Sequence, residues 1–61
     1  MWVYGIISIL DGNNEISSVY NAKTWVDEED TWTAIDRATA YWDRMFENFG
    51  AYVVIDDVWA K

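Results

Sequence analysis

The chain has 61 residues, eleven acidic and four basic side chains, and a formal net charge of −7 at neutral pH. This charge argues against direct binding to DNA, RNA or an anionic membrane, because phosphate groups are held by clustered Lys and Arg side chains. Cys and His are absent, which excludes disulfides within these residues, thiolate zinc sites and the usual transition-metal ligands. We therefore expect a single domain over residues 1–61, with no cofactor and a core rich in aromatic side chains.

The first predicted element is a strand over residues 2–10, WVYGIISIL, which is rich in β-branched and aromatic residues. Apolar side chains fall on both alternating faces, which indicates a central strand or a strand covered on both sides. The DGNN segment at 11–14 predicts a hairpin turn, because Asp, Gly and Asn tolerate turn conformations. Residues 15–22, EISSVYNA, then form the predicted second strand, and residues 23–30 connect it to a helix.

A helix is predicted over about residues 28–48, because apolar residues recur there at spacings of three and four. The expected core stripe consists of Trp32, Ile35, Ala38, Trp42, Met45 and Phe49, with Phe46 alongside. Acidic residues in the first turn suit the positive end of the helix dipole, and Asp27 or Asp30 is a suitable N-cap. Gly50 follows the stripe and is a suitable residue to end the helix.

The last predicted strand lies within residues 51–60, AYVVIDDVWA, beside the first strand. The predicted architecture is α+β, a β-hairpin–helix–strand (ββαβ) order with one helix packed on a three-stranded sheet. Asp56 and Asp57 must point to opposite faces of the sheet unless a β-bulge or an early strand end intervenes. A charged edge that blocks aggregation and a functional carboxylate are both consistent with this pair.

The acidic side chains are the first candidate functional feature. Steps of seven and four residues return to almost the same helical angle, so four carboxylates are expected on nearly one line: Glu29, Asp36, Asp43 and Glu47. These steps correspond to about 10 and 6 Å, distances comparable with the separation of phosphates along DNA. Arg44 is placed to pair with Glu47, but most of the row has no counter-charge on the helix.

Further carboxylates adjoin this row. At its N-terminal end lies the DEED run, formed by Asp27, Glu28, Glu29 and Asp30. Asp56 and Asp57 are expected to extend the negative surface onto the last strand. One interpretation is an ordinary solvated helix face with a favourable helix start. The other is that the surface presents phosphate-like charge to a protein that normally binds nucleic acid.

Trp25 is the second candidate feature, because it lies between the second strand and the helix, next to the acidic run. It is either a hydrophobic staple with Val26 or an exposed anchor of the kind that becomes a binding hot spot. The predicted partner-binding set is therefore Trp25, Asp27, Glu28, Glu29, Asp30, Asp36, Asp43, Glu47, Asp56 and Asp57.

Catalysis is not expected. Without His or Cys, paired carboxylates are the remaining candidates for acid–base work, and so small a domain has little room for a substrate cleft. The apolar stretches are shorter than the ~20 residues that span a bilayer, and the N-terminal stretch lacks the basic segment and cleavage site of a signal peptide. We therefore expect a cytoplasmic protein with no membrane partner, for which a homodimer is an open alternative.

A tiny acidic chain without Cys, with a ββαβ layout and a carboxylate row, resembles small phage-encoded inhibitors of host proteins. These include DNA mimics that block nucleases, anti-CRISPR proteins and inhibitors of bacterial RNA polymerase. The resemblance covers the whole chain in charge and layout and carries over no individual residue. It implies a non-enzymatic inhibitor of a basic, nucleic-acid-binding host protein. The alternative is a general interaction module or self-associating domain that uses aromatic or β-edge contacts.

Overall fold

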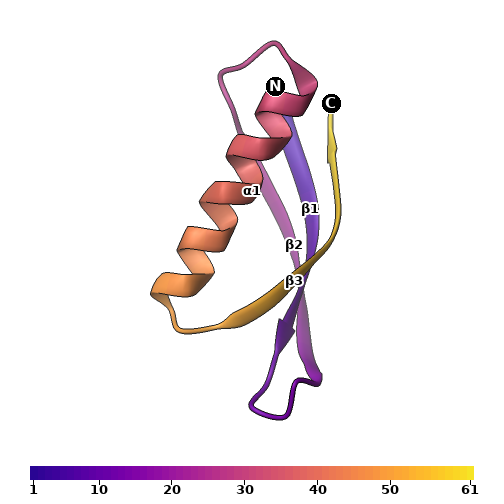
Figure 1. The fold of residues 1–61 in the computed structure, drawn as a ribbon. Coiled ribbons are helices and arrows are strands. Elements are labelled where there is room, and N and C mark those ends of the chain that lie inside the picture. The colour runs from indigo at the N-terminus through magenta and orange to yellow at the C-terminus, as the bar shows by residue number, and fades with distance from the viewer.

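A computed structural model describes residues 1–61. The chain forms, in order, β1 (Trp2–Leu10), β2 (Ile16–Trp25), α1 (Thr31–Asn48) and β3 (Tyr52–Ala60). The strands build one antiparallel sheet in the order β2-β1-β3, and α1 lies against one face of it (Figure 1). The predicted α+β fold, its ββαβ order and the position of the last strand beside the first are confirmed.

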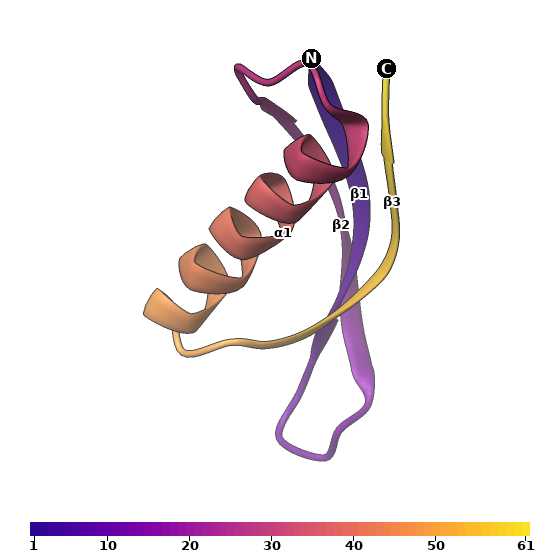
Figure 2. The ribbon, with the colours of Figure 1, turned by 45° about the horizontal axis from the view of Figure 1, so that its top comes forward.

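The sheet has a face covered by α1 and an open face. In the second view, α1 lies on one side of the strands and no element lies on the other (Figure 2). Val3, Gly5 and Ile7 of β1 are buried on the covered face, and the alternate residues of β1 point to the open face. β1 is therefore the central strand, but a single helix leaves its second face uncovered.

The core lies between α1 and the covered face. Its buried apolar residues are Val3, Ile7, Ala22, Ala34, Ala38, Trp42 and Phe46. The four helical members recur every fourth residue, because positions four apart lie on one side of a helix. The Trp42 ring packs directly against the β1 backbone at Gly5. A Cβ on Gly5 would lie 2.5 Å from the indole, so the ring fits there only because Gly5 has no side chain.

Two members of the predicted apolar stripe lie outside the core. Trp32 is 75% exposed and Phe49 is 81% exposed. Ala34 and Ala38 bring the first half of α1 close to the sheet, and the large Trp32 ring projects from the side of the helix instead. Phe49 follows the last helical residue as the C-cap. The other members of the stripe are buried or half-buried, as expected.

The N-terminus of α1 differs from the predicted one. The helix begins at Thr31 rather than at residue 28, and Asp30, one of the two predicted N-caps, has an extended backbone at φ −78° and ψ 120°. Its carboxylate accepts a hydrogen bond from the Thr33 N–H at 2.9 Å. The first turn contains no acidic residue, so the DEED run lies before the helix and not within it.

The C-terminus of α1 matches the prediction. Gly50 directly follows the C-cap and has a φ of 71°, a conformation that glycine adopts without steric cost. Its N–H donates to the Glu47 carbonyl at 2.9 Å, and the Ala51 N–H donates to the Phe46 carbonyl at 3.0 Å. This pair of bonds is a Schellman motif, which satisfies carbonyls that the helix leaves unpaired.

The hairpin turn agrees with the prediction, and the second strand extends beyond its predicted end. The Asp11 carboxylate accepts hydrogen bonds from the N–H groups of Asn13 and Glu15, at 2.8 and 3.1 Å, as suits the predicted turn. β2 continues to Trp25, three residues beyond the predicted strand, and Trp25 pairs with Trp2. The chain has no helix of the length and apolar character needed to cross a membrane.

Candidate functional site

Three carboxylates of the predicted line lie along one side of α1. They are Asp36, Asp43 and Glu47, all exposed, and they are called the acidic row below. Steps of seven and four residues separate them by about 10 and 6 Å along the helix axis. Glu29 does not belong to this row, because α1 begins only at Thr31 and Glu29 lies in the preceding loop.

The acidic row has no partner of opposite charge within the chain. The one ion pair of the molecule joins Arg37 Nη2 to Glu28 Oε2 at 3.6 Å. The expected pair between Arg44 and Glu47 does not form, although the spacing allows it. Solvent and dissolved salt therefore provide the counter-charge of the acidic row, and a cationic partner can replace them.

Two carboxylates of the DEED run already accept hydrogen bonds from groups of the same chain. One oxygen of Glu28 accepts the N–H groups of Glu29 and Asp30, at 3.1 and 3.3 Å. Asp30 accepts the Thr33 hydroxyl at 2.7 Å as well as the N–H, and these bonds, the hydroxyl bond foremost, lower the pKa of its carboxyl. Asp27 and Glu29 remain exposed. The run therefore shapes the helix start and leaves two of its four carboxylates available to a partner.

Asp56 and Asp57 lie on the open face of the sheet. The register of β3 against β1 shifts between Ile6 and Ile7, which leaves Asp56 as the extra residue of a β-bulge. The nearly buried Ser8 hydroxyl donates to the Asp56 carboxylate. The bulge keeps both carboxylates out from under α1. Both carboxylates are exposed on the last strand, but they lie on the open face and do not continue the acidic row on α1.

Both tryptophans near the acidic residues are exposed, although the sequence predicts this only as one of two alternatives for Trp25 and predicts a core position for Trp32. Trp25 ends β2 on the open face, 58% exposed, with its ring packed edge-on against Trp2 at a centroid distance of 5.4 Å. Trp32, predicted to be core, is exposed and lies four residues before Asp36 on the same side of α1. The four-residue spacing between Trp32 and Asp36 indicates that the two lie on one side of the helix, but Trp32 also fits the predicted apolar stripe.

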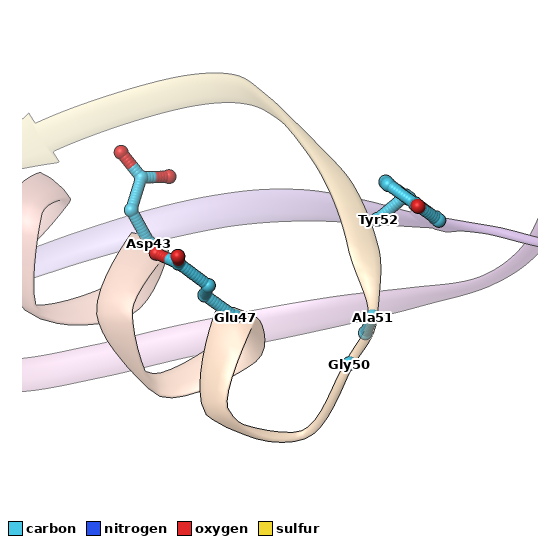
Figure 3. Close-up of a pocket in the computed structure, with 5 residues that line it drawn as sticks. All are labelled: Asp43, Glu47, Gly50, Ala51 and Tyr52. Atoms are coloured by element: carbon cyan, nitrogen blue, oxygen red, sulfur yellow. The ribbon is translucent and has the colours of Figure 1, made fainter.

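A shallow pocket of about 270 Å³ adjoins the C-terminal end of the acidic row (Figure 3). Its lining residues are Asp43, Glu47, Gly50, Ala51 and Tyr52. The two carboxylates extend from α1, and the Tyr52 ring projects from β3 on the side away from them. The pocket is smaller than the roughly 300–1,000 Å³ typical of small-molecule sites, and it is open to solvent. It suits a protruding side chain of a protein partner better than an enclosed substrate.

Comparisons with protein-family models, with curated proteins and with solved structures found no match. No family is therefore assigned to the chain. The candidate site rests on its own geometry, which consists of the acidic row, the adjoining pocket and Trp32 on the same helix. The structure brings no three acidic side chains close enough together to hold a metal ion.

Proposed function

We propose that this protein is a non-enzymatic inhibitor whose acidic row occupies a basic, nucleic-acid-binding groove of a host protein. The observation that carries the proposal is an exposed helical row of carboxylates with no ion pair. A groove lined by Lys and Arg attracts such a row over long distances and pairs with it on contact. Phage origin and action in the host cytoplasm, implied by the resemblance, belong to the same proposal.

Trp32 supports the proposal by adding an apolar contact in line with the charges. Charge complementarity mainly gives specificity and fast association, whereas buried aromatic side chains supply much of the binding energy at interfaces. From the sequence, Trp25 is a candidate for the anchor role, but it lies on the open face of the sheet, opposite the layer that carries the acidic row. The role passes to Trp32, which is exposed without a ring partner in its own chain.

The first experiment identifies the partner. The tagged protein captures proteins from a bacterial lysate at low salt, and bound proteins are eluted with increasing salt. We expect to capture a nucleic-acid-binding protein. Duplex DNA or RNA should release it from the tagged chain, because the nucleic acid and the acidic row bind in the same groove. Its affinity for the chain should fall steeply with added salt, since exposed charges are screened. A captured partner that still binds its nucleic acid in the complex would contradict the proposed inhibition.

The second experiment tests the acidic row with a matched control. Asp43→Asn/Glu47→Gln removes two charges from the row, and Asp11→Asn/Glu15→Gln removes two charges from the hairpin turn while keeping the Asp11 acceptor. We expect the row variant to bind the captured partner about tenfold or more weakly, because close charge pairs across an interface commonly contribute that much. The turn variant should bind like the parent. An equal loss of affinity in both variants would show that only net charge matters, and would contradict the proposal.

A further inference from the structure

The open face of the sheet carries most of the exposed large apolar side chains of the molecule, and it borders the acidic row only at Tyr52, which also lines the pocket. Its exposed large apolar side chains are Trp2, Ile16, Val19, Trp25, Tyr52, Val54 and Trp59. We propose that two copies of this chain pack through their open sheet faces into a two-fold symmetric dimer. This inference goes beyond the proposed function, because it concerns the layer that faces away from the acidic row.

The aromatic side chains of this face are already ordered by one another. Trp2 and Trp25 pack edge-on, and Tyr4 stacks on Trp59 at a centroid distance of 5.8 Å with 12° between the rings. The Lys23 Nζ atom lies 4.4 Å from the centre of the Trp2 ring. Rings held in this way lose little conformational freedom on association, which favours binding through them.

The exposed apolar area of this face approaches that of a stable dimer contact. Trp2, Trp25, Tyr52 and Trp59 are 40%, 58%, 73% and 37% exposed. At 150–250 Å² for a whole aromatic side chain, these rings alone expose roughly 300–500 Å². The aliphatic residues of the same face bring the patch towards the ~800 Å² per partner that stable interfaces bury. A patch that approaches ~800 Å² would exceed the roughly 300–600 Å² of the largest patch on a typical monomer.

The small core gives a further reason for a second copy. The covered face and α1 together bury only seven apolar residues completely or nearly so. A domain of about 60 residues is marginally stable on such a core, and association is a common way to add buried surface. Face-to-face packing of two sheets would turn two half-buried layers into a continuous four-layer molecule with a second core at its centre.

The charges of the open face are complementary to themselves. A two-fold axis parallel to the strands places β2 of one copy over β3 of the other. Lys23 and Trp59 both lie opposite Tyr4, so Lys23 of one copy faces Trp59 of the other across the ~10 Å between packed sheets. Along the strand direction it is offset from Asp57 by one strand repeat, about 7 Å, a separation that the long Lys23 side chain can bridge. Neither Lys23 nor Asp57 has an ion pair within its own chain. The dimer contains this complementary pair twice.

The β3 edge of the sheet favours face packing over strand addition. β3 is an edge strand, and its bulge with Asp56 and Asp57 interrupts the regular ladder that an added strand would need. Strand addition would also leave the apolar open faces in water. A second copy on the open face covers the exposed rings and requires no change in either edge.

Light scattering on a sizing column, over a wide range of protein concentration, tests the dimer. We expect twice the mass of the chain at high concentration. Trp25→Ser should raise the dissociation constant about tenfold or more, as loss of an interface tryptophan commonly does. Trp32→Ser is the matched control, because it removes an exposed tryptophan from α1, and it should leave the dissociation constant unchanged. Circular dichroism checks that both variants stay folded.

Charge reversal tests the two-fold geometry. Lys23→Glu and Asp57→Lys should each weaken the dimer by placing like charges together, and the double variant should recover most of the affinity. A double variant weaker than either single variant overturns the geometry. A chain that stays monomeric overturns the dimer itself. A monomer whose tryptophan fluorescence changes on addition of a single-stranded oligonucleotide or another protein does so too, because the open face would then bind that partner instead. Equal weakening by Trp25→Ser and Trp32→Ser does the same.

Discussion

The Asp30 carboxylate, which belongs to the DEED run, caps the N-terminus of α1. Its oxygen accepts both the N–H and the hydroxyl of Thr33, and so satisfies a donor that the first turn of α1 leaves free. Both Asp27 and Asp30 fitted the N-cap from the sequence, because each precedes the apolar stripe by a suitable distance. The choice depends on where the backbone leaves its extended conformation, and local residue preferences do not determine that position.

The Asp30 cap predicts a dependence of stability on pH. The hydrogen bonds from Thr33 lower the pKa of the folded carboxyl below its ordinary value of 3.8. Its stabilising effect is therefore complete above that value and is lost as the pH falls through the folded pKa. We expect Asp30→Ala to lower the urea midpoint at neutral pH, and this difference should shrink below about pH 4. Unfolding curves at several pH values provide the measurement.

A control variant separates the charge of Asp30 from its hydrogen bonds. Asp30→Asn keeps an oxygen acceptor for Thr33 and removes the carboxylate. It should be less destabilised than Asp30→Ala, and its own midpoint should lack the contribution that Asp30 makes to the pH dependence. A difference between the parent and Asp30→Ala that stays constant into strong acid would mean that the ionised cap is not its cause.

At the scale of the elements, the C-terminus of α1 depends on one glycine. Gly50 has a positive φ, and the Schellman motif is built around that conformation. We expect Gly50→Ala to destabilise the fold by about 1 kcal/mol, because a Cβ disfavours the left-handed region. Gly12→Ala is the matched control, since Gly12 has no positive φ and a Cβ there meets no atom within 4 Å. Urea unfolding measures both changes, and equal effects would contradict the role of the Gly50 conformation.

The elements themselves could be predicted from the sequence, but the buried side of α1 could not. The strand, turn and helix signals are local, so the ββαβ order and the Gly50 stop follow from them. The buried row from Ala34 to Phe46 depends on a contact between distant residues, Gly5 and Trp42. The periodic apolar pattern admits neighbouring rows equally well, so the sequence places Trp32 in the core and does not indicate its position beside Asp36.

The same limit applies to the candidate site. The spacing of Asp36, Asp43 and Glu47 follows from helical geometry, so their alignment could be predicted. The separation of Asp56 and Asp57 from this row could not, because it depends on the bulge in β3 and on which face α1 covers. The open face also escaped prediction, because apolar residues on both sides of β1 gave no indication that only one side is covered.

At the scale of the whole molecule, the two proposed surfaces occupy opposite layers. α1 carries the acidic row, and the open sheet face carries the aromatic side chains. A dimer through the open faces would leave both helices at the outside, with an acidic row on each. Partner binding and self-association would then be compatible, and a partner with two basic sites would bind the dimer more tightly than the monomer through effective concentration.

Both surfaces depend on the close packing of α1 on the sheet, and Gly5 sets that distance. A Cβ on Gly5 would lie 2.5 and 2.9 Å from two carbons of the buried Trp42 ring. We expect Gly5→Ala to destabilise the fold by about 1–3 kcal/mol, because the ring has to shift within a filled core. Trp42→Phe, which removes ring atoms at this contact, should cost about 1–2 kcal/mol through the lost buried area.

The double variant decides whether this contact is the cause. With the smaller ring, the added methyl group has room, so Gly5→Ala/Trp42→Phe should be less destabilised than the two single changes predict by about 0.5–3 kcal/mol. Unfolding of all four proteins at one fixed concentration gives this coupling, since self-association shifts apparent stability. Additive effects would place the cost of Gly5→Ala elsewhere, for example in the β1 backbone. A clear coupling would show that a glycine in the central strand and a tryptophan 37 positions later together hold the helix layer at its short distance from the sheet.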